Sequence, residues 1–347
     1  VADLDGDGSL EILGASQEIY AVTADGLDFV DGDADVRTLG ILTQTEEARF
    51  WNTPAVGDVD GDGDSELAAP AWDGFVHLVD HEGRSLPGWP RNANAFGYPS
   101  PNPVGSACLG DLDADGDLEI LCSVARGLYA WHHTGMEVVD GDGDSRTDGV
   151  FAVTGANFSY GTPTLANIDS EPYPEVVAGM RDGSLHVFDH TGSPYPGFPL
   201  ATGGDITSSP AVGDIDLDGR VEIVFGSSNG LLYAIRHDLT SPPGFPAPVA
   251  LDEDWDSSPA LGDLNGDGLL DVVIGSSDGL LHALSGGDAS ALPGFPVPIR
   301  NSLGAPVATR SSPVIADVNG DGVLDIVIGD RAGRLSGFTG TGALLPG

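Results

Sequence analysis

Short runs of acidic residues are the feature of this 347-residue chain with the clearest chemical potential. One of them, DIDLDGRVE from Asp214 to Glu222, places four carboxylates around a single glycine within nine residues. At an effective dielectric constant of about 20, two like charges about 4 Å apart repel each other by roughly 4 kcal/mol. Folding such a run therefore requires something that offsets the negative charge.

The run occurs seven times, at intervals of 47 to 56 residues. The other copies are DLDGDGSLE from Asp3, DVDGDGDSE from Asp58, DLDADGDLE from Asp111, NIDSEPYPE from Asn167, DLNGDGLLD from Asp263 and DVNGDGVLD from Asp317. Each copy, which we call an acidic loop, carries oxygen-bearing side chains at its positions 1, 3, 5 and 9. A fixed period of about 50 residues is typical of a repeat architecture.

The spacing of these oxygens predicts a calcium site. Glycine at position 6 permits a tight turn, the acids then lie on one side of it, and the carbonyl of position 7 points inward. Six to eight oxygen ligands suit Ca²⁺ better than the smaller, octahedral Mg²⁺. An EF-hand loop is excluded, because position 12 is apolar rather than Glu. A bound dication would offset the repulsion.

The predicted side-chain ligands are Asp3, Asp5, Asp7, Glu11, Asp58, Asp60, Asp62, Glu66, Asp111, Asp113, Asp115, Glu119, Asn167, Asp169, Glu171, Glu175, Asp214, Asp216, Asp218, Glu222, Asp263, Asn265, Asp267, Asp271, Asp317, Asn319, Asp321 and Asp325. The predicted carbonyl ligands are those of Ser9, Asp64, Asp117, Tyr173, Arg220, Leu269 and Val323.

The copies are not equivalent. Repeat 4 has Pro172 where the others have the turn glycine, so we expect its loop to bind most weakly or to be empty. An insertion in repeat 3, DGDGDSRTD, offers a further set of ligands in Asp140, Asp142, Asp144 and Asp148, or else is a solvated acidic hairpin. The prediction is six or seven Ca²⁺ sites, and eight if the insertion also binds.

The segments around each loop predict the elements that hold it. SSPAVGD precedes the loop at Asp214, EIVFGSSNGLLYAI follows it, and a Pro-Gly-aromatic-Pro segment comes next. Short β-branched runs separated by Asn-Gly or Asp-Gly turns predict antiparallel hairpins. We count four strands per repeat, with the acidic loop between the first and second strands.

Seven four-stranded units predict an all-β fold, a seven-bladed β-propeller that forms one domain over residues 1–347. The expected blades are 1–48, 49–102, 103–156, 157–205, 206–254, 255–308 and 309–347. The first blade lacks its first strand, and we expect the sequence to be trimmed at both ends, as a mature or excised piece.

Composition restricts the partners. The formal net charge is −41, and all 13 basic residues are Arg. Such a surface repels nucleic acid and anionic membranes, and no apolar run of 18 residues could insert into a bilayer. Adaptation to high salt is a second explanation of this acidity.

The repeat resembles a known family, the FG-GAP/VCBS-type calcium-binding propeller repeats found in the head of integrin α-subunits. The resemblance rests on SSPAVGDIDLDGRVEIVFGSSNGLLYA and its copies and covers nearly the whole chain. It implies a seven-bladed propeller with calcium loops, an extracellular or cell-surface setting, and often adhesion or carbohydrate contact.

Several features that suggest catalysis have simpler explanations. GSSNG and GSSDG match the G-x-S-x-G motif of hydrolases, which needs a strand-to-helix turn, but here they lie in predicted strand-to-strand hairpins. Seven histidines recur at two fixed repeat positions, which indicates packing or turn roles: His77, His186 and His282 share one, and His81, His133, His190 and His237 share the other. Cys108 and Cys122 flank one acidic loop, where hairpin symmetry allows a cross-strand disulfide or two buried thiols.

Departures from the repeat suggest where a ligand binds. The candidate residues lie just before the first strands of their repeats, and they are Arg49, Trp51, Tyr160, Trp255 and Arg310. Aromatics beside polar groups suit sugar stacking or protein contacts, although they also fit packing between blades.

Three functions remain open. The first is a non-catalytic extracellular propeller for adhesion, assembly or the binding of a glycan or protein. The second is a polysaccharide lyase or hydrolase on a propeller scaffold, for which Arg49, Tyr160 and Arg310 would have to converge. The third is a self-assembling subunit of a surface layer or filament.

Overall fold

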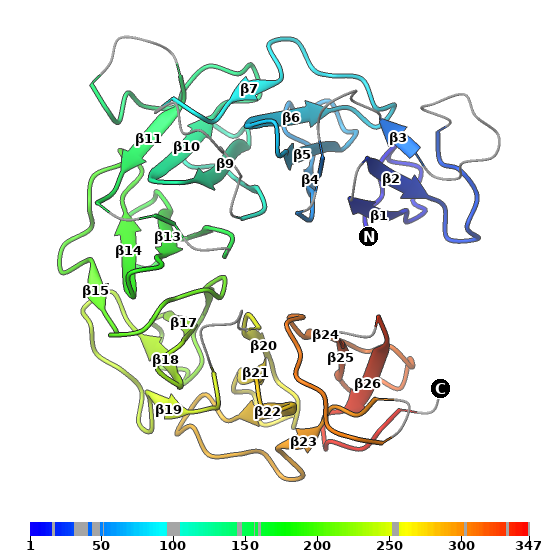
Figure 1. Cartoon of the computed structure of the whole chain (residues 1–347), viewed down its shortest axis with the longest axis vertical. Helices are drawn as coiled ribbons and strands as arrows, with labels where there is room; N and C mark the ends of the chain where they lie inside the picture. The colour runs from blue at the N-terminus through cyan, green and yellow to red at the C-terminus, as the bar shows by residue number, and fades with distance from the viewer. Residues whose placement is uncertain are drawn as a thin grey trace. The chain divides into compact units, whose positions relative to one another are not determined.

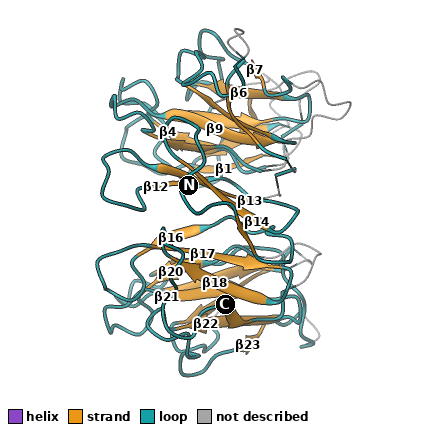
Figure 2. Cartoon of the chain, turned by 90° about the vertical axis from the view of Figure 1, so that its left-hand side faces the viewer, coloured by secondary structure: helices purple, strands orange, loops and turns teal. Residues whose placement is uncertain are grey.

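A computed structural model describes the chain except for residues 16–17, 31–40, 44–48, 51, 96–104, 144–147, 156, 159–160, 252–256, 302–303, 331–332 and 346–347. Within the described residues every regular element is a β-strand, and loops and turns join the strands (Figure 2). No helix long and apolar enough to cross a membrane is found in this part of the chain.

The strands form seven antiparallel sheets that follow one another along the chain, from blue to red in Figure 1. The first sheet contains β1 (Ile12–Ala15), β2 (Ile19–Val22) and β3 (Ile41–Thr43). The second contains β4 (Ala55–Gly57), β5 (Glu66–Pro70), β6 (Phe75–Val79) and β7 (Arg91–Asn92). The third contains β8 (Cys108–Gly110), β9 (Glu119–Val124), β10 (Gly127–Trp131) and β11 (Val150–Val153).

The other four sheets repeat this order. The fourth contains β12 (Thr164–Ala166), β13 (Glu175–Gly179), β14 (Ser184–Phe188) and β15 (Leu200–Ala201). The fifth contains β16 (Ala211–Gly213), β17 (Glu222–Ser227), β18 (Leu231–Ile235) and β19 (Ala247–Pro248). The sixth contains β20 (Ala260–Gly262), β21 (Asp271–Gly275), β22 (Leu280–Leu284) and β23 (Val297–Pro298). The seventh contains β24 (Val314–Ala316), β25 (Asp325–Gly329) and β26 (Leu335–Thr339).

This strand organisation confirms the predicted class, an all-β, seven-bladed propeller built from four-stranded antiparallel blades. Five sheets have all four strands in the described residues, and the first and seventh have three. In the first repeat only the bridge between Ala2 and Glu11 precedes β1, in the place of a first strand.

The described residues form two compact units. The first is Val1–Phe158 with Pro172–Val176 and Phe188–Pro194, and the second is Ser159–Glu171, Val177–Val187 and Tyr195–Gly347. Within each unit, apolar clusters join the second and third strands of one sheet to those of the next. Trp131, which is fully buried, stacks on Tyr129 and meets the edge of Trp89 in one such cluster.

The turn residues act as the sequence predicts. Gly230 and Gly279 have φ values of 86° and 83° in the hairpins between second and third strands, a conformation that glycine adopts without strain. In repeats 2, 4, 5 and 6 the Pro-Gly-aromatic-Pro segment buries its aromatic ring, and the fourth strand begins directly after it.

Candidate metal sites

The acidic loops connect the first strand of a sheet to the second, as predicted. In the second repeat, for example, the loop from Asp58 runs from the end of β4 to Glu66, the first residue of β5. Because the antiparallel pairing on both sides fixes the two ends of the loop, its nine residues are held in one compact turn.

Side chains within the loop hold its backbone. The carboxylate at position 5 accepts a hydrogen bond from the N–H of position 7 in six repeats, for example from Asp64 to Asp62 at 3.0 Å. The side chain at position 3 accepts one from the N–H of position 5, again in six repeats. These bonds turn the acids toward the inside of the loop.

Two positions of the loop adopt left-handed backbone conformations, whereas the sequence analysis identified only one. Gly63 and Gly268, at position 6, have φ values of 101° and 91°. Position 4 is also left-handed, even where it is not glycine, as at Ala114 (φ 60°) and Leu217 (φ 56°). Proline cannot adopt this conformation, so Pro172 makes the loop of repeat 4 different.

The acid at position 9 is buried in all seven repeats. Its side chain points into the base of the loop and is at most 3% exposed. In five repeats it accepts a hydrogen bond from the N–H of position 2, for example from Val59 to Glu66 at 3.0 Å. Burial raises the pKa of Glu66, Glu119 and Glu222 to about 7 and that of Asp271 to about 6.

A buried carboxylate needs a compensating positive charge or a proton. Four loops gather at least three carboxylate groups whose oxygens lie within 4.8 Å of one another. The groups are Asp3, Asp5 and Glu11; Asp58, Asp60 and Asp62; Asp113, Asp115 and Glu119 with His132; and Asp214, Asp216 and Asp218.

In the sixth and seventh loops, the evidence for a cation site is a buried carboxylate oxygen that has no hydrogen-bond partner. Asp271 Oδ1 and Asp325 Oδ2 are buried and lack a hydrogen-bond partner. Position 3 in these loops is Asn265 or Asn319, which still offers an amide oxygen. Oxygen donors without protein partners, held on a preformed turn, fit a hard divalent cation.

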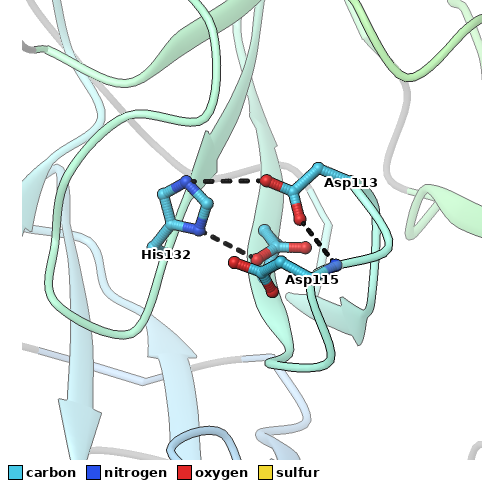
Figure 3. Close-up of side chains that lie close together, drawn as sticks. Asp113, Asp115 and His132 are labelled. Carbon is cyan, nitrogen blue, oxygen red and sulfur yellow. Dashed lines mark hydrogen bonds and ion pairs between the residues drawn. The ribbon is translucent and has the colours of Figure 1, made fainter.

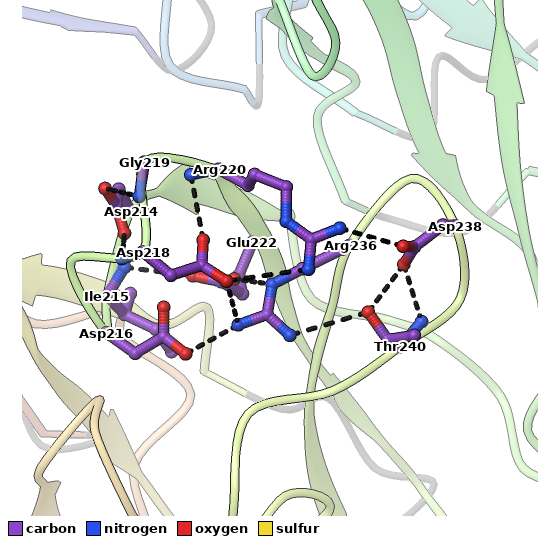
Figure 4. Close-up of polar contacts among 10 residues, drawn as sticks. All are labelled: Asp214, Ile215, Asp216, Asp218, Gly219, Arg220, Glu222, Arg236, Asp238 and Thr240. Carbon is purple, nitrogen blue, oxygen red and sulfur yellow. Dashed lines mark hydrogen bonds and ion pairs between the residues drawn. The ribbon is translucent and has the colours of Figure 1, made fainter.

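Repeat 5 has an internal cation that the sequence analysis missed (Figure 4). Arg236, just after β18, is 6% exposed and places its guanidinium among the acids of the loop. Its Nη2 lies 2.5 Å from Asp216 and 3.0 Å from Asp218, and its Nε lies 2.8 Å from Glu222. In the stretch DIDLDGRVE, a guanidinium therefore offsets much of the repulsion.

Repeat 3 has a histidine at the equivalent place (Figure 3). His132 Nδ1 lies 3.0 Å from Glu119 Oε1, and its Nε2 lies 3.9 Å from Asp113 Oδ2. Asp115 completes the group of Figure 3. The sequence does hold a signal for Arg236 and His132. Each is a basic residue directly after the third strand, at a repeat position that is Ser, Thr or Asp in the other repeats.

Repeat 4 uses its acids differently. Asp169 Oδ2 accepts a hydrogen bond from the Tyr195 hydroxyl at 2.8 Å, and Asn167 donates its amide to the carbonyl of Glu171. The Tyr195 hydroxyl also lies 3.2 Å from Nδ1 of His237. No group of three acids comparable with those of the other loops is found among the described residues of this repeat.

The insertion in repeat 3 is only partly described, since Asp144 lies outside the described residues. Asp140 accepts a hydrogen bond from the N–H of Gly143 at 2.8 Å, which closes a turn. Asp142 lies in that turn, whereas Asp148 lines a pocket beside β7. The described residues do not bring these acids together as a metal cluster.

The predicted ligand-binding residues are mostly not placed. Trp51, Tyr160 and Trp255 lie outside the described residues, and Arg49 and Arg310 are exposed, one in each unit. A pocket of about 430 Å³ lies instead beside β7, lined by Phe75, Pro90, Arg91, Asn92, Asn94, Ala95, Trp131 and Asp148.

The expected alignment of the two cysteines is wrong. Cys108 pairs with Leu121, so Cys122 is displaced by one residue and points to the other face of the sheet. A disulfide requires side chains that point toward each other, and both cysteines are free thiols.

The other candidate catalytic residues occupy structural positions. Both G-x-S-x-G motifs lie in hairpins between strands, at β17–β18 and β21–β22. His77 contacts Phe50 edge to face, and burial lowers the pKa of His186 and His282. His81 and His133 each lie 3.4 Å from the residue at loop position 7.

Comparison with known proteins agrees with this architecture. Residues 263–328 match the FG-GAP-like repeat family, and a comparison with curated proteins finds no match. BamB from Moraxella catarrhalis is 14% identical, with a TM-score of 0.56 over 97% of this chain and 83% of that one. BBS1N in its complex with ARL6DN is also 14% identical, with a TM-score of 0.52 over 85% and 81%.

At such identities the structural likeness shows the fold alone. The family match runs from the acidic loop of repeat 6, through β21 to β24, to the acidic loop of repeat 7 and most of β25, and the structure repeats this order of loop and strands along the chain. The chain is therefore a β-propeller whose sixth and seventh repeats match the FG-GAP-like repeat family.

Proposed function

We propose that this chain is a non-catalytic, calcium-stabilised propeller that works outside the cell as a binding module for adhesion, assembly or recognition of a glycan or protein. The observation that carries the calcium part is the buried acid at position 9 of every loop. Burying seven carboxylates without counter-charge would destabilise the fold, and a bound cation removes that cost.

The loops differ in how they meet this need. Loops 1, 2, 6 and 7 have no basic side chain among the ion pairs described for their acids at positions 3, 5 and 9, so we assign Ca²⁺ to these four. Arg236 serves the same purpose in loop 5, and in loop 4 the carboxylate of Asp169 accepts hydrogen bonds from the Tyr195 hydroxyl and the Glu171 N–H. Calcium at these sites would stiffen the hairpins that begin each second strand.

The exposure of the loops supports the proposed extracellular setting. Most of the acids at positions 3 and 5 are exposed or half-exposed, which suits modest affinity. Extracellular calcium modules bind with Kd values of about 10⁻⁴ to 10⁻³ M, which only the millimolar calcium outside cells would fill.

The recognition part has a candidate place in the pocket beside β7. Arg91 and Asn92 offer hydrogen-bonding groups, and Arg91 Nε has no hydrogen-bond partner. Phe75 and Pro90 supply apolar walls. Polar groups beside aromatic rings are what a sugar or a short peptide requires.

The calcium assignment is tested by equilibrium dialysis and thermal unfolding. We expect at least four bound Ca²⁺ per chain and a marked fall in Tm after chelation. At ten times Kd each site adds about 1.4 kcal/mol, so four sites add about 6 kcal/mol. An unchanged Tm in excess chelator would overturn this part of the proposal.

The recognition role is tested by screening immobilised glycans and incubating polysaccharides with the protein, with and without calcium. Calcium-dependent retention without products, reduced by Arg91→Ala, is the expected result. Depolymerised products would overturn the non-catalytic assignment in favour of a lyase or hydrolase, and calcium-dependent filaments would favour the surface-layer alternative.

A further inference from the structure

Each repeat has one residue at the end of the third strand that is paired with the start of the second strand. It lies opposite the acid at position 9, as the pairing of Asp325 with Thr339 shows in repeat 7. We call it the opposing residue. In chain order the opposing residues are Thr23, Asp80, His132, Asp189, Arg236, Ser285 and Thr339.

Repeat 5 shows that this position can deliver positive charge to the loop. The guanidinium of Arg236 contacts the acids of positions 3, 5 and 9 together. The interior of the loop is therefore large enough for a cationic group, and the opposing residue determines what stands there.

His132 is the only opposing residue of the seven that carries a neutral nitrogen donor. It lies beside Glu119 and Asp113, and one ligand atom from each of these residues and from Asp115 fits within 4.8 Å. Glu119 is fully buried, and Asp111 Oδ1, at position 1 of the same loop, is buried without a hydrogen-bond partner.

Ligand chemistry distinguishes this site from its neighbours. Ca²⁺ takes oxygen ligands, whereas imidazole with two or three carboxylates suits Zn²⁺, Co²⁺ or Mn²⁺. Ligands about 2.0 Å from a tetrahedral ion lie roughly 3.3 Å from each other. His132 would offer one nitrogen to such an ion: its Nδ1 lies 3.0 Å from Glu119 Oε1, close to that value.

We infer that the acidic loop of repeat 3 is a mixed nitrogen and oxygen site for a divalent transition metal, formed by Asp113, Asp115, Glu119 and His132. The inference rests on the proposed use of the loops as cation sites. It assigns this loop a different ion from the calcium loops of the same chain.

The test is competitive binding of Co²⁺. The protein is first saturated with millimolar Ca²⁺ and then dialysed against micromolar Co²⁺ in a buffer that keeps the millimolar Ca²⁺, and both bound metals are counted. We expect about one Co²⁺ per chain that excess Ca²⁺ does not displace, with a visible absorption band from the nitrogen-ligated ion.

The matched variants are His132→Ser and His133→Ser. Serine is the opposing residue of repeat 6, so the fold should accept it, and circular dichroism checks this. His132→Ser should weaken Co²⁺ binding at least about tenfold, because loss of even an outer partner of a metal costs 10- to 100-fold. His133→Ser, which removes the imidazole beside Asp117, should bind Co²⁺ as the unchanged chain does.

No retained Co²⁺ in the unchanged chain, or equal retention by His132→Ser, would overturn the inference. Calcium counted in the same samples separates the two proposals. Bound Ca²⁺ without bound Co²⁺ rejects only the transition-metal site. Absence of bound Ca²⁺ rejects the calcium part of the proposed function, and absence of both metals rejects both proposals.

Discussion

Arg236 and Ser285 hold the same position in adjacent repeats, and the two loops they face differ in the counter-charge available to them. In repeat 5, the guanidinium contacts three acids of the loop, whereas in repeat 6, Asp271 keeps a buried oxygen without a partner. A single side chain thus decides whether the protein itself supplies a positive charge to the loop.

Replacing Arg236 should convert the loop of repeat 5 into a calcium site. Arg236→Ser removes the internal cation from Asp216, Asp218 and Glu222. We expect one more bound Ca²⁺ per chain in equilibrium dialysis. In calcium-free buffer the variant should lose about 3–5 kcal/mol of stability, the usual cost of removing one partner of a buried ion pair.

Arg220→Ser is the control for that change. Arg220 pairs with Asp238 at 2.8 Å on the exposed side of the same loop, where ion pairs contribute little. Its loss should change neither the calcium count nor the stability appreciably. An Arg236→Ser chain with an unchanged calcium count would contradict the role assigned to the guanidinium.

At the scale of the element, features set by neighbouring residues in the hairpin could be predicted from the sequence, whereas features set by pairing between its strands could not. The strand order and the buried ninth acid follow from a pattern of adjacent residues, which sequence shows directly. The role of His132 and Arg236 depends on pairing between the second and third strands, about 13 residues later. Cys108 and Cys122 show the same limit, because a register offset by one residue reverses the face of a side chain.

The buried ninth acids should make the calcium-free protein sensitive to pH. The folded-state pKa of Glu66 is about 7, above the ordinary value of 4.5, because burial favours the neutral form. The folded chain then binds more protons than the unfolded chain between these values, so this group's contribution to stability falls as pH rises from 4.5 to 7.

Glu66→Gln isolates this effect from that of His186 and His282, whose pKa values are lowered by burial and which therefore act in the opposite direction. Glutamine still accepts the hydrogen bond from Val59 but does not ionise. In calcium-free buffer, the stability of the variant relative to the unchanged chain should therefore increase from pH 4.5 to 7 and level off above. A pH-independent difference in Tm would show that Glu66 ionises freely in the folded chain.

At the scale of the whole molecule, the property that needs an explanation is the formal net charge of −41. Two explanations fit it: acids committed to site-bound calcium, and a general adaptation to high salt. Screening of dispersed charges depends on ionic strength, and at 0.1 M the Debye length is about 10 Å. Site binding depends instead on the identity of the ion and its ligands.

Thermal unfolding in matched salts separates these explanations. Millimolar Ca²⁺ should raise the Tm of the calcium-free protein well above that in NaCl of equal ionic strength. Mg²⁺ should raise it less, because it demands octahedral geometry and keeps its water ligands. NaCl should still give a gradual increase up to molar concentrations, since it screens the acids outside the loops. If all three salts had the same effect at equal ionic strength, the acidity would reflect salt adaptation, and the calcium assignment would fail.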